Sequence, residues 1–267
     1  MSTSSRFVPV PFRHRLRPVY RLLQKSAISA ADCVRTSAIW PRPKSIKAVL
    51  GELVGQPSTG DLYRIGQREF GILQVEAEIT EFLEYVALDR PRTVGEIGLK
   101  HGGNSFLFLR KFQDLQLFVG LDLLVANSRK LRYLAMPGQR LKFLEGNSYA
   151  PETVARVGAI LGARQFDFLF IDGDHSYAGV CADLQAYYRF VRPGGLIAFH
   201  DIVPDEMARF GVRPESSSCY GGDVYRLWNT LKHHFEYREF VADWEQIGFG
   251  IGVIRKPLGE SQLPSGI

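Results

Sequence analysis

Four acidic or imidazole side chains stand at the ends of two apolar runs in the second half of the chain. Asp172 and His175 follow the first run, and His200 and Asp201 follow the second. Carboxylates and imidazoles bind ligands and transfer protons, and both runs are typical of buried strands. The pattern therefore predicts one site built from two strand ends.

Two parallel strands must position these four residues. Segment 166–171, Phe-Asp-Phe-Leu-Phe-Ile, has the length and aromatic content of a buried strand, and 195–199 repeats the pattern after a Pro-Gly-Gly turn at 193–195. Residues 177–191 between them are expected to form the crossover helix. Because ligands of an open α/β sheet bind outside the carboxyl ends of its strands, this placement favours a functional site.

The remaining sequence predicts the rest of that sheet. An amphipathic helix is expected over 74–88, and helical segments separate the strands that follow. Further strands are expected at 93–97, 117–121, 142–144, 235–241 and 249–255. We therefore predict an α/β fold: a Rossmann-like, doubly wound, seven-stranded sheet, mostly parallel with the last strand antiparallel.

A glycine-bearing turn follows the first strand and opens a helix. Its glycines, Gly98 and Gly102, let backbone approach a ligand, and the helix N-terminus offers free N–H groups. A dinucleotide fingerprint would need glycine where Lys100 stands, so NAD is disfavoured. Glu96, just before the first glycine, suits a cationic ligand instead.

Two further strand ends add polar groups at the same edge. Asp122 ends the second strand, where a carboxylate can accept both hydroxyls of a ribose, and Asn147 and Ser148 follow the third, in reach of an adenine. Taken singly, Glu96 and Asp122 could be ordinary strand-end residues. Together they suit a cationic nucleoside such as S-adenosylmethionine.

Three motifs carry a family resemblance: E-I-G-x-x-x-G-G-N-S at 96–105, F-I-D-G-D-H-S-Y at 170–177 and R-P-G-G-L-I-A-F-H-D at 192–201. From about 74 to 255 the chain resembles class I S-adenosylmethionine-dependent methyltransferases. Within them it is most similar to the metal-dependent O-methyltransferases of the cephalosporin hydroxylase-like and macrolide-sugar methyltransferase group. The resemblance implies these cofactor-binding residues: Glu96, Gly98, Gly102, Ser105, Asp122, Asn147, Ser148 and Asp172.

The same resemblance implies a divalent cation, Mg²⁺ or Mn²⁺, held by Asp172, His200 and Asp201. His200 departs from the family, which usually has an acid there, and an imidazole favours softer metals such as Mn²⁺, Fe²⁺, Co²⁺ or Zn²⁺ or leaves the cation to the two aspartates. His175 matches the position of a base, which together with Asp172 makes the implied catalytic pair. Asp172 could also be an acid at the cofactor edge without a metal.

The charge of the chain is unevenly distributed. Residues 1–50 hold ten Lys and Arg against one acid, whereas the rest holds 23 basic and 27 acidic residues. The body is therefore mildly acidic, and nucleic acid is disfavoured as a partner. We predict three parts: a basic N-terminal helical extension at 1–70, a methyltransferase domain at 71–257 and a tail at 258–267.

The compartment follows from cysteines and hydropathy. Cys33, Cys181 and Cys219 form no CxxC pair, and no apolar run is long enough to span a membrane, which favours a reduced, cytoplasmic protein. Residues 13–23 could form a basic amphipathic helix for peripheral contact with an anionic membrane, a solvated leader or a transit peptide.

The leading functional prediction is an O-methyltransferase that acts on a hydroxyl of a small molecule such as a sugar, glycolipid or secondary metabolite. The alternatives are a nucleic-acid methyltransferase anchored by the basic leader, a non-catalytic S-adenosylmethionine-binding protein, and an oxidative hydroxylase. A homo-oligomer is expected, and the long loop at 204–222 is a candidate lid or an irregular surface loop.

Overall fold

The computed structural model describes residues 44–55, 57–211, 221–259 and 263. They belong to a compact unit, Pro43–Ile267, whereas a separate unit, Met1–Arg42, lies outside the described residues. The basic helix expected at 13–23, Cys33, Cys219, the centre of the expected lid and most of the tail also lie outside them.

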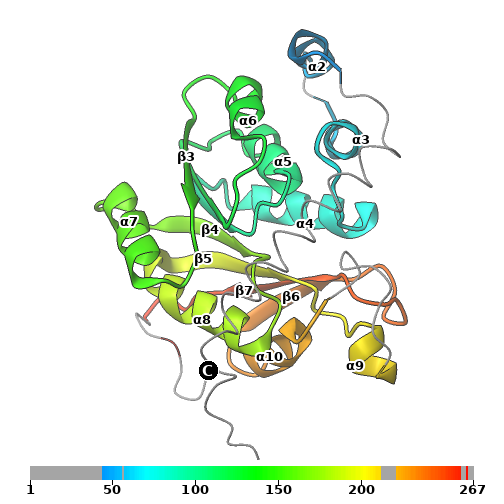
Figure 1. Ribbon diagram of the computed structural model, residues 1–267, viewed down its shortest axis with the longest axis vertical. Helices are drawn as coiled ribbons and strands as arrows, with labels where there is room; N and C mark the ends of the chain where they lie inside the picture. The colour runs from blue at the N-terminus through cyan, green and yellow to red at the C-terminus, as the bar shows by residue number, and fades with distance from the viewer. Residues whose placement is uncertain (1–43, 56, 212–220, 260–262, 264–267) are drawn as a thin grey trace, which may run out of the picture. The chain divides into compact units, whose positions relative to one another are not determined.

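Seven strands of the described residues form one sheet in the order β3-β2-β1-β4-β5-β7-β6. Figure 1 labels β3, β4, β5, β7 and β6 of this sheet. The strands are β1 (Thr93–Ile97), β2 (Leu117–Asp122), β3 (Arg140–Glu145), β4 (Phe166–Ile171), β5 (Val191–His200), β6 (Glu236–Phe240) and β7 (Ile251–Arg255). Strand β7 pairs antiparallel with β5 and β6, and the neighbours from β3 to β5 pair parallel. The predicted sheet is confirmed.

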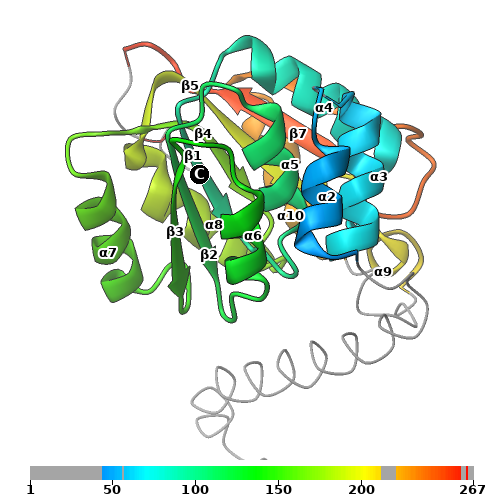
Figure 2. The same ribbon diagram turned by 90° about the horizontal axis from the view of Figure 1, so that it is seen from above.

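Helices cover both faces of this sheet. They are α2 (Ile46–Glu52), α3 (Thr59–Phe70), α4 (Glu76–Leu88), α5 (Gly103–Lys111), α6 (Ser128–Leu134), α7 (Pro151–Leu161), α8 (Tyr177–Tyr187), α9 (Glu206–Phe210) and α10 (Val224–Leu231), with a 3-10 turn η2 (Tyr188–Phe190). Figure 2 shows α5 and α6 on one side of the sheet and α7 and α8 on the other. Each side has its own apolar cluster, so the sheet is doubly wound.

The strand order reverses direction at the centre of the sheet. Strand β1 lies between β2 and β4, so the chain leaves β1 toward one edge and returns to the other side of β1 to form β4. At such a reversal the connections diverge to opposite faces, and ligands of α/β folds generally bind outside the carboxyl ends of the two central strands. The loops after β1 and β4 therefore meet at this edge.

Residues 44–70, which the sequence assigns to the extension, form α2 and α3 within the same compact unit as the sheet. Ser58 and Asp61 form a capping box at the start of α3. Helix α3 packs closely on α5: a Cβ at Gly66 would lie 3.1 Å from the Phe106 ring. Glu69, whose side chain is fully buried, pairs with Arg68 and Lys130 and ties α3 to α6.

Strand β5 is longer than its apolar core predicts. The Pro-Gly-Gly sequence at 193–195, expected to be a turn before the strand, lies inside it, and the pairing with β4 shifts register between Phe166 and Phe168. Gly194 takes a positive φ of 72° and donates its N–H to Lys256, which in turn donates to Gly195. The glycines thus form an irregularity in a continuous strand rather than a turn.

No helix in the described ranges is long and apolar enough to span a membrane.

Candidate functional site

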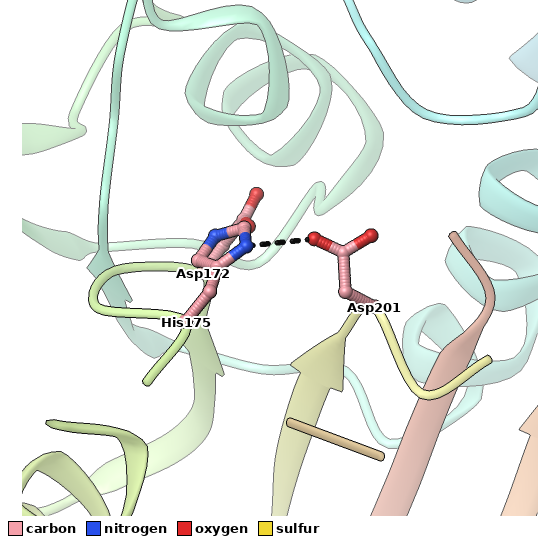
Figure 3. A group of neighbouring side chains, drawn as sticks. All are labelled: Asp172, His175 and Asp201. Atoms are coloured by element: carbon pink, nitrogen blue, oxygen red, sulfur yellow. Dashed lines mark ion pairs between the residues drawn. The ribbon is translucent and has the colours of Figure 1, made fainter. Parts of the chain in front are cut away.

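The carboxyl ends of β4 and β5 bring Asp172, His175 and Asp201 together. One ligand atom from each lies within 4.8 Å of the others (Figure 3). The His175 ring lies between the two carboxylates, with Nδ1 3.0 Å from Asp201 Oδ2 and Nε2 3.3 Å from Asp172 Oδ1. Two acids and an imidazole with converging atoms are a set that can hold a divalent cation or move a proton.

His200 is the fourth member of this cluster. Its Nδ1 lies 3.4 Å from Asp172 Oδ1 and 3.4 Å from Asp201 Oδ2, so it approaches the same two oxygens as His175. The ring is 5% exposed, and neither of its nitrogens has a hydrogen-bond partner of good geometry among the described residues. Nδ1 therefore interacts with the two carboxylates mainly through charge, and Nε2 keeps capacity for a further partner.

The charges in the cluster shift every pKa. Burial lowers the pKa of His175, but its contacts with Asp172 and Asp201 outweigh burial and raise it to about 10. Burial also lowers the pKa of His200, but the charges of Asp201 and Asp172 outweigh burial and raise this pKa well above its usual value. Burial raises the pKa of each aspartate, but the imidazoles hold both below their ordinary values.

Local backbone geometry fixes the two aspartates. The Asp172 N–H donates to the Ile97 carbonyl at 2.8 Å, which anchors the end of β4 on the end of β1. Asp201 takes a positive φ of 63°, a conformation that aspartate tolerates better than most residues. Its Oδ1 accepts the Phe249 N–H at 3.0 Å, which leaves Oδ2 for the imidazoles.

Gln74 is a contact of this site that the sequence reading missed. Its side-chain amide donates to Asp172 Oδ2 at 3.2 Å, and its backbone carbonyl accepts the Tyr63 hydroxyl. Residue 74 lies 98 positions before Asp172, and its pattern predicts only the start of an amphipathic helix. No local signal could have placed it at the end of β4.

Glu96 of β1 and Ser105 of α5, on the two sides of the loop after β1, are joined by a hydrogen bond. Both are fully buried, and the Ser105 hydroxyl donates to Glu96 Oε2 at 2.5 Å. Within the described part of the chain, Glu96 Oε1 has no hydrogen-bond partner. Burial raises the pKa of Glu96 well above its ordinary value, with smaller contributions from the charges of Asp172 and Asp122. The carboxyl therefore has a free acceptor that a cationic donor would satisfy.

The glycines of this loop are required by close backbone approach. Gly98 has a φ of 87°, and a Cβ there would lie 1.9 Å from the carbonyl oxygen of Asp172. Gly102 has a φ of 85°, and a Cβ there would lie 2.8 Å from Leu131 Cδ1 of α6. Both glycines are needed for packing, whatever the loop binds.

The predicted ribose and adenine residues lie on the loops after β2 and β3. Asp122 accepts the backbone N–H of Lys100 at 2.8 Å and of Leu124 at 3.1 Å. A carboxylate has about four acceptor positions, so capacity for hydroxyl donors remains. Asn147 is exposed and its Oδ1 accepts the Tyr149 N–H, while the carbonyl of Ser148 accepts the Tyr187 hydroxyl at 2.6 Å.

The described ends of the loop at 204–222 lie against the cluster. Asp205 caps α9 through Ala208 and also accepts the Gly222 N–H at 3.1 Å. The Asp223 N–H donates to the His175 carbonyl at 2.8 Å. The loop therefore contains a short helix and returns directly to His175, and its role as a lid stays a prediction.

Comparisons with known proteins match the central part of this chain to a family model. Residues 96–202 match the family model described as a methyltransferase domain, which spans the loops after β1 to β5. The uncharacterised protein R132 of Acanthamoeba polyphaga mimivirus is 28% identical over 115 residues, which are 41% of this chain and 51% of that protein. This chain thus aligns with about half the length of that relative.

Solved structures share the fold. The MycE methyltransferase of the mycinamycin biosynthetic pathway, in complex with Mg, SAH and mycinamycin VI, has a TM-score of 0.51 at 20% identity, covering 79% of this chain and 58% of its own. A putative O-methyltransferase from Klebsiella pneumoniae has a TM-score of 0.51 at 21% identity, and the match covers 88% of this chain and 99% of that protein. Cofactor-bound Rv0187 from MTB has a TM-score of 0.53 at 19% identity, and the match covers 81% of this chain and 99% of that protein. Residues 96–202 therefore match a methyltransferase domain, and the chain shares the fold of these three solved structures.

Proposed function

We propose that the chain transfers a methyl group from S-adenosylmethionine to a hydroxyl of a small molecule, at a site that also holds a divalent cation. The observation that carries this proposal is the grouping of Asp172, His175 and Asp201 at two strand ends, in backbone contact with the loop at Gly98. A cofactor on that loop and an acceptor at the acidic cluster would be neighbours. Methyl transfer requires this proximity.

The residues present fit the cofactor. The unpaired Oε1 of Glu96 suits the amino group of the methionine part, and Asp122 keeps acceptor capacity for the ribose. Gly98, Gly102 and Ser105 shape the loop between them, and Asn147 and Ser148 are assigned to the adenine. S-adenosylmethionine supplies a methyl group whose bond to the sulfonium sulfur breaks as its bond to the acceptor oxygen forms.

The residues also fit a cation. We assign Asp172 and Asp201 to it, with the buried imidazole of His200 behind them, whose nitrogens have no hydrogen-bond partner of good geometry in the described chain. Oxygen donors suit Mg²⁺, and the added nitrogen favours Mn²⁺. A divalent cation lowers the pKa of an acceptor hydroxyl and fixes its position.

His175 is assigned as the base that removes the proton of the acceptor hydroxyl. Its side chain is 24% exposed against 5% for His200, so it is the imidazole that an acceptor can reach. Its pKa of about 10 depends on the charges of Asp172 and Asp201. Neutralising those charges lowers the pKa of His175 toward the range in which a base works at neutral pH.

Two structures with the same fold support a small acceptor. MycE was crystallised with Mg, SAH and mycinamycin VI, and the Klebsiella protein is described as a putative O-methyltransferase. Because identity to both is low, the acceptor of this chain is a proposal, and sugars, glycolipids and secondary metabolites are its first candidates.

The test is calorimetric titration of metal-stripped protein with S-adenosylmethionine, with NAD as the control, before and after addition of Mg²⁺ or Mn²⁺. We expect saturable binding of S-adenosylmethionine, no binding of NAD, and separate heat from the cation. Methyl transfer is then measured with radiolabelled cofactor against a panel of small hydroxyl compounds and against RNA.

Each alternative predicts a different result in this scheme. Cofactor binding without transfer to either panel would favour a non-catalytic binding protein. Transfer to RNA that disappears when residues 1–50 are removed would favour a nucleic-acid methyltransferase. Absence of S-adenosylmethionine binding under every condition would reject the proposal.

A further inference from the structure

Glu78 is a buried carboxylate that the proposed reaction does not use. It lies on α4 and is 2% exposed, with its oxygens directed to the connection between β6 and β7. Oε1 accepts the Ala242 N–H at 3.0 Å and the Gln246 side-chain amide at 2.7 Å, and Oε2 accepts the Gly250 N–H at 3.0 Å. A buried acid with this many donors from one segment fixes the conformation of that segment.

The segment that Glu78 holds has an unusual backbone. Gly248, Phe249 and Gly250 take φ values of 73°, 63° and 79°, and Phe249 is a residue that rarely adopts such a conformation. Gln246 braces the same turn, because its amide also donates to the Gly248 carbonyl at 3.1 Å and its Oε1 accepts the Asp243 N–H. A left-handed run of this kind persists only when its surroundings impose it.

This backbone reaches the functional site through one hydrogen bond. The Phe249 N–H donates to Asp201 Oδ1 at 3.0 Å, and the Phe249 carbonyl accepts the Val203 N–H at 3.0 Å. Asp201 itself has a φ of 63°. The direction of the Asp201 carboxylate therefore depends on where the Phe249 N–H points, and that depends on the next residue, Gly250, which Glu78 holds.

We propose that Glu78 is a positioning residue for Asp201, acting through Gly250 and Phe249. The inference rests on the proposed function only in that Asp201 is taken as a cation ligand. Glu78 touches neither Asp172 nor His175 through any described hydrogen bond, and it is separated from Gly250 by 172 positions. Partners of this kind, one step behind a ligand, orient the ligand and tune its affinity.

The first test needs no metal and no activity. Amide hydrogen exchange of Phe249 is measured by NMR in the full-length metal-free protein, in Glu78→Gln and in the matched control Glu81→Gln. Glu81 lies on the same helix, is 63% exposed and pairs with Arg238 at the surface. We expect Phe249 to exchange roughly tenfold faster in Glu78→Gln relative to the amides of β1 and β2, and unchanged in the control.

The second test measures Mn²⁺ affinity by electron paramagnetic resonance. Glu78→Gln should weaken Mn²⁺ binding about tenfold and leave S-adenosylmethionine affinity within about twofold, whereas a general loss of stability would move both. Gln246→Ala keeps the Glu78 carboxylate but removes its side-chain donor, together with the bonds of Gln246 to Gly248 and Asp243, and it should also speed Phe249 exchange and weaken Mn²⁺ binding. If Glu78→Gln does not fold, Gln246→Ala takes its place in both tests.

The two tests separate this proposal from the proposed function. The positioning role would be overturned if Glu78→Gln accelerated exchange equally at all amides, or if it left the exchange of the Phe249 amide unchanged. Either result would count whatever the Mn²⁺ measurement shows. A wild-type protein that binds no Mn²⁺ would overturn the cation site, and the exchange of the Phe249 amide would still decide whether Glu78 positions Asp201.

Discussion

At the scale of single residues, the site consists of two carboxylates and two imidazoles whose charges compensate each other. Asp172 Oδ1 and Asp201 Oδ2 are each approached by both His175 and His200, at distances between 3.0 and 3.4 Å. Without a cation the imidazoles supply the positive charge that these carboxylates need, which explains the raised pKa of each histidine. A bound cation would therefore compete with protons for the same oxygens.

The aspartates provide the first prediction. Asp172→Asn and Asp201→Asn should each abolish measurable methyl transfer and Mn²⁺ binding, because an amide is a poor cation ligand. Asparagine also tolerates the positive φ of Asp201, so circular dichroism should show an intact fold. The control is Asp174→Asn, whose side chain caps Ser176 in the same loop. Full activity of either site variant after metal stripping would reject the metal-assisted mechanism.

The histidines are predicted to differ. His175→Asn should lower turnover by roughly 100-fold or more while Mn²⁺ and S-adenosylmethionine still bind, since it removes the base. His200→Asn should instead weaken Mn²⁺ binding. Electron paramagnetic resonance and single-turnover rates at neutral pH measure the two effects. Loss of Mn²⁺ binding in His175→Asn would show that His175 is a ligand, and unchanged turnover would remove it as the base.

Glu96 gives a pH prediction for the cofactor-free protein. Burial raises its pKa in the folded state, so its contribution to stability is fully present below the unfolded value of about 4.5 and is lost as pH rises through the folded value. Glu96→Gln has no such loss, so its stability advantage over wild type should grow from pH 5 to pH 8 in urea unfolding. Glu81→Gln should show no comparable trend. A difference that is flat with pH would contradict a buried, proton-binding Glu96.

At the scale of elements, the loops after β1 and β4 behave as one unit. Gly98 leaves no room for a side chain against the Asp172 carbonyl, and the Asp172 N–H is held by Ile97. A ligand that orders either loop therefore orders the other. We expect S-adenosylmethionine and Mn²⁺ to raise each other's affinity by the same factor, about fivefold or more, in titrations of each with the other absent or saturating. Independent affinities would show that the loops are uncoupled.

Element-scale features were also the part of the structure that the sequence predicts best. Apolar runs such as 166–171 predict the strands, and the residue after each run lies at the edge where ligands bind. The contacts of Gln74 and Glu78 were not predictable, since their partners lie 98 and 172 positions away. Local pattern also misplaced the start of β5, because Pro-Gly-Gly is typical of turns and here forms an irregularity within a strand.

At the scale of the whole molecule, the compact unit from Pro43 contains every residue assigned to the cofactor and the cation. Removal of residues 1–42 should therefore leave S-adenosylmethionine affinity and methyl transfer within about twofold of wild type, while any binding to anionic vesicles is lost. Calorimetry and vesicle sedimentation at two salt concentrations measure these effects. A large loss of cofactor affinity would show that the basic segment contributes to the site.

The expected homo-oligomer and the expected cytoplasmic location remain predictions, and the edges of the sheet bear on the first. Edge strand β3 exposes Arg140 and Lys142, and edge strand β6 exposes Glu236 and Arg238. Charged residues on an edge oppose strand addition, because a second sheet would have to bury them. The fold thus protects itself against aggregation at both ends of the sheet, and copies of this chain are expected to associate through helices and not by extending one sheet into another.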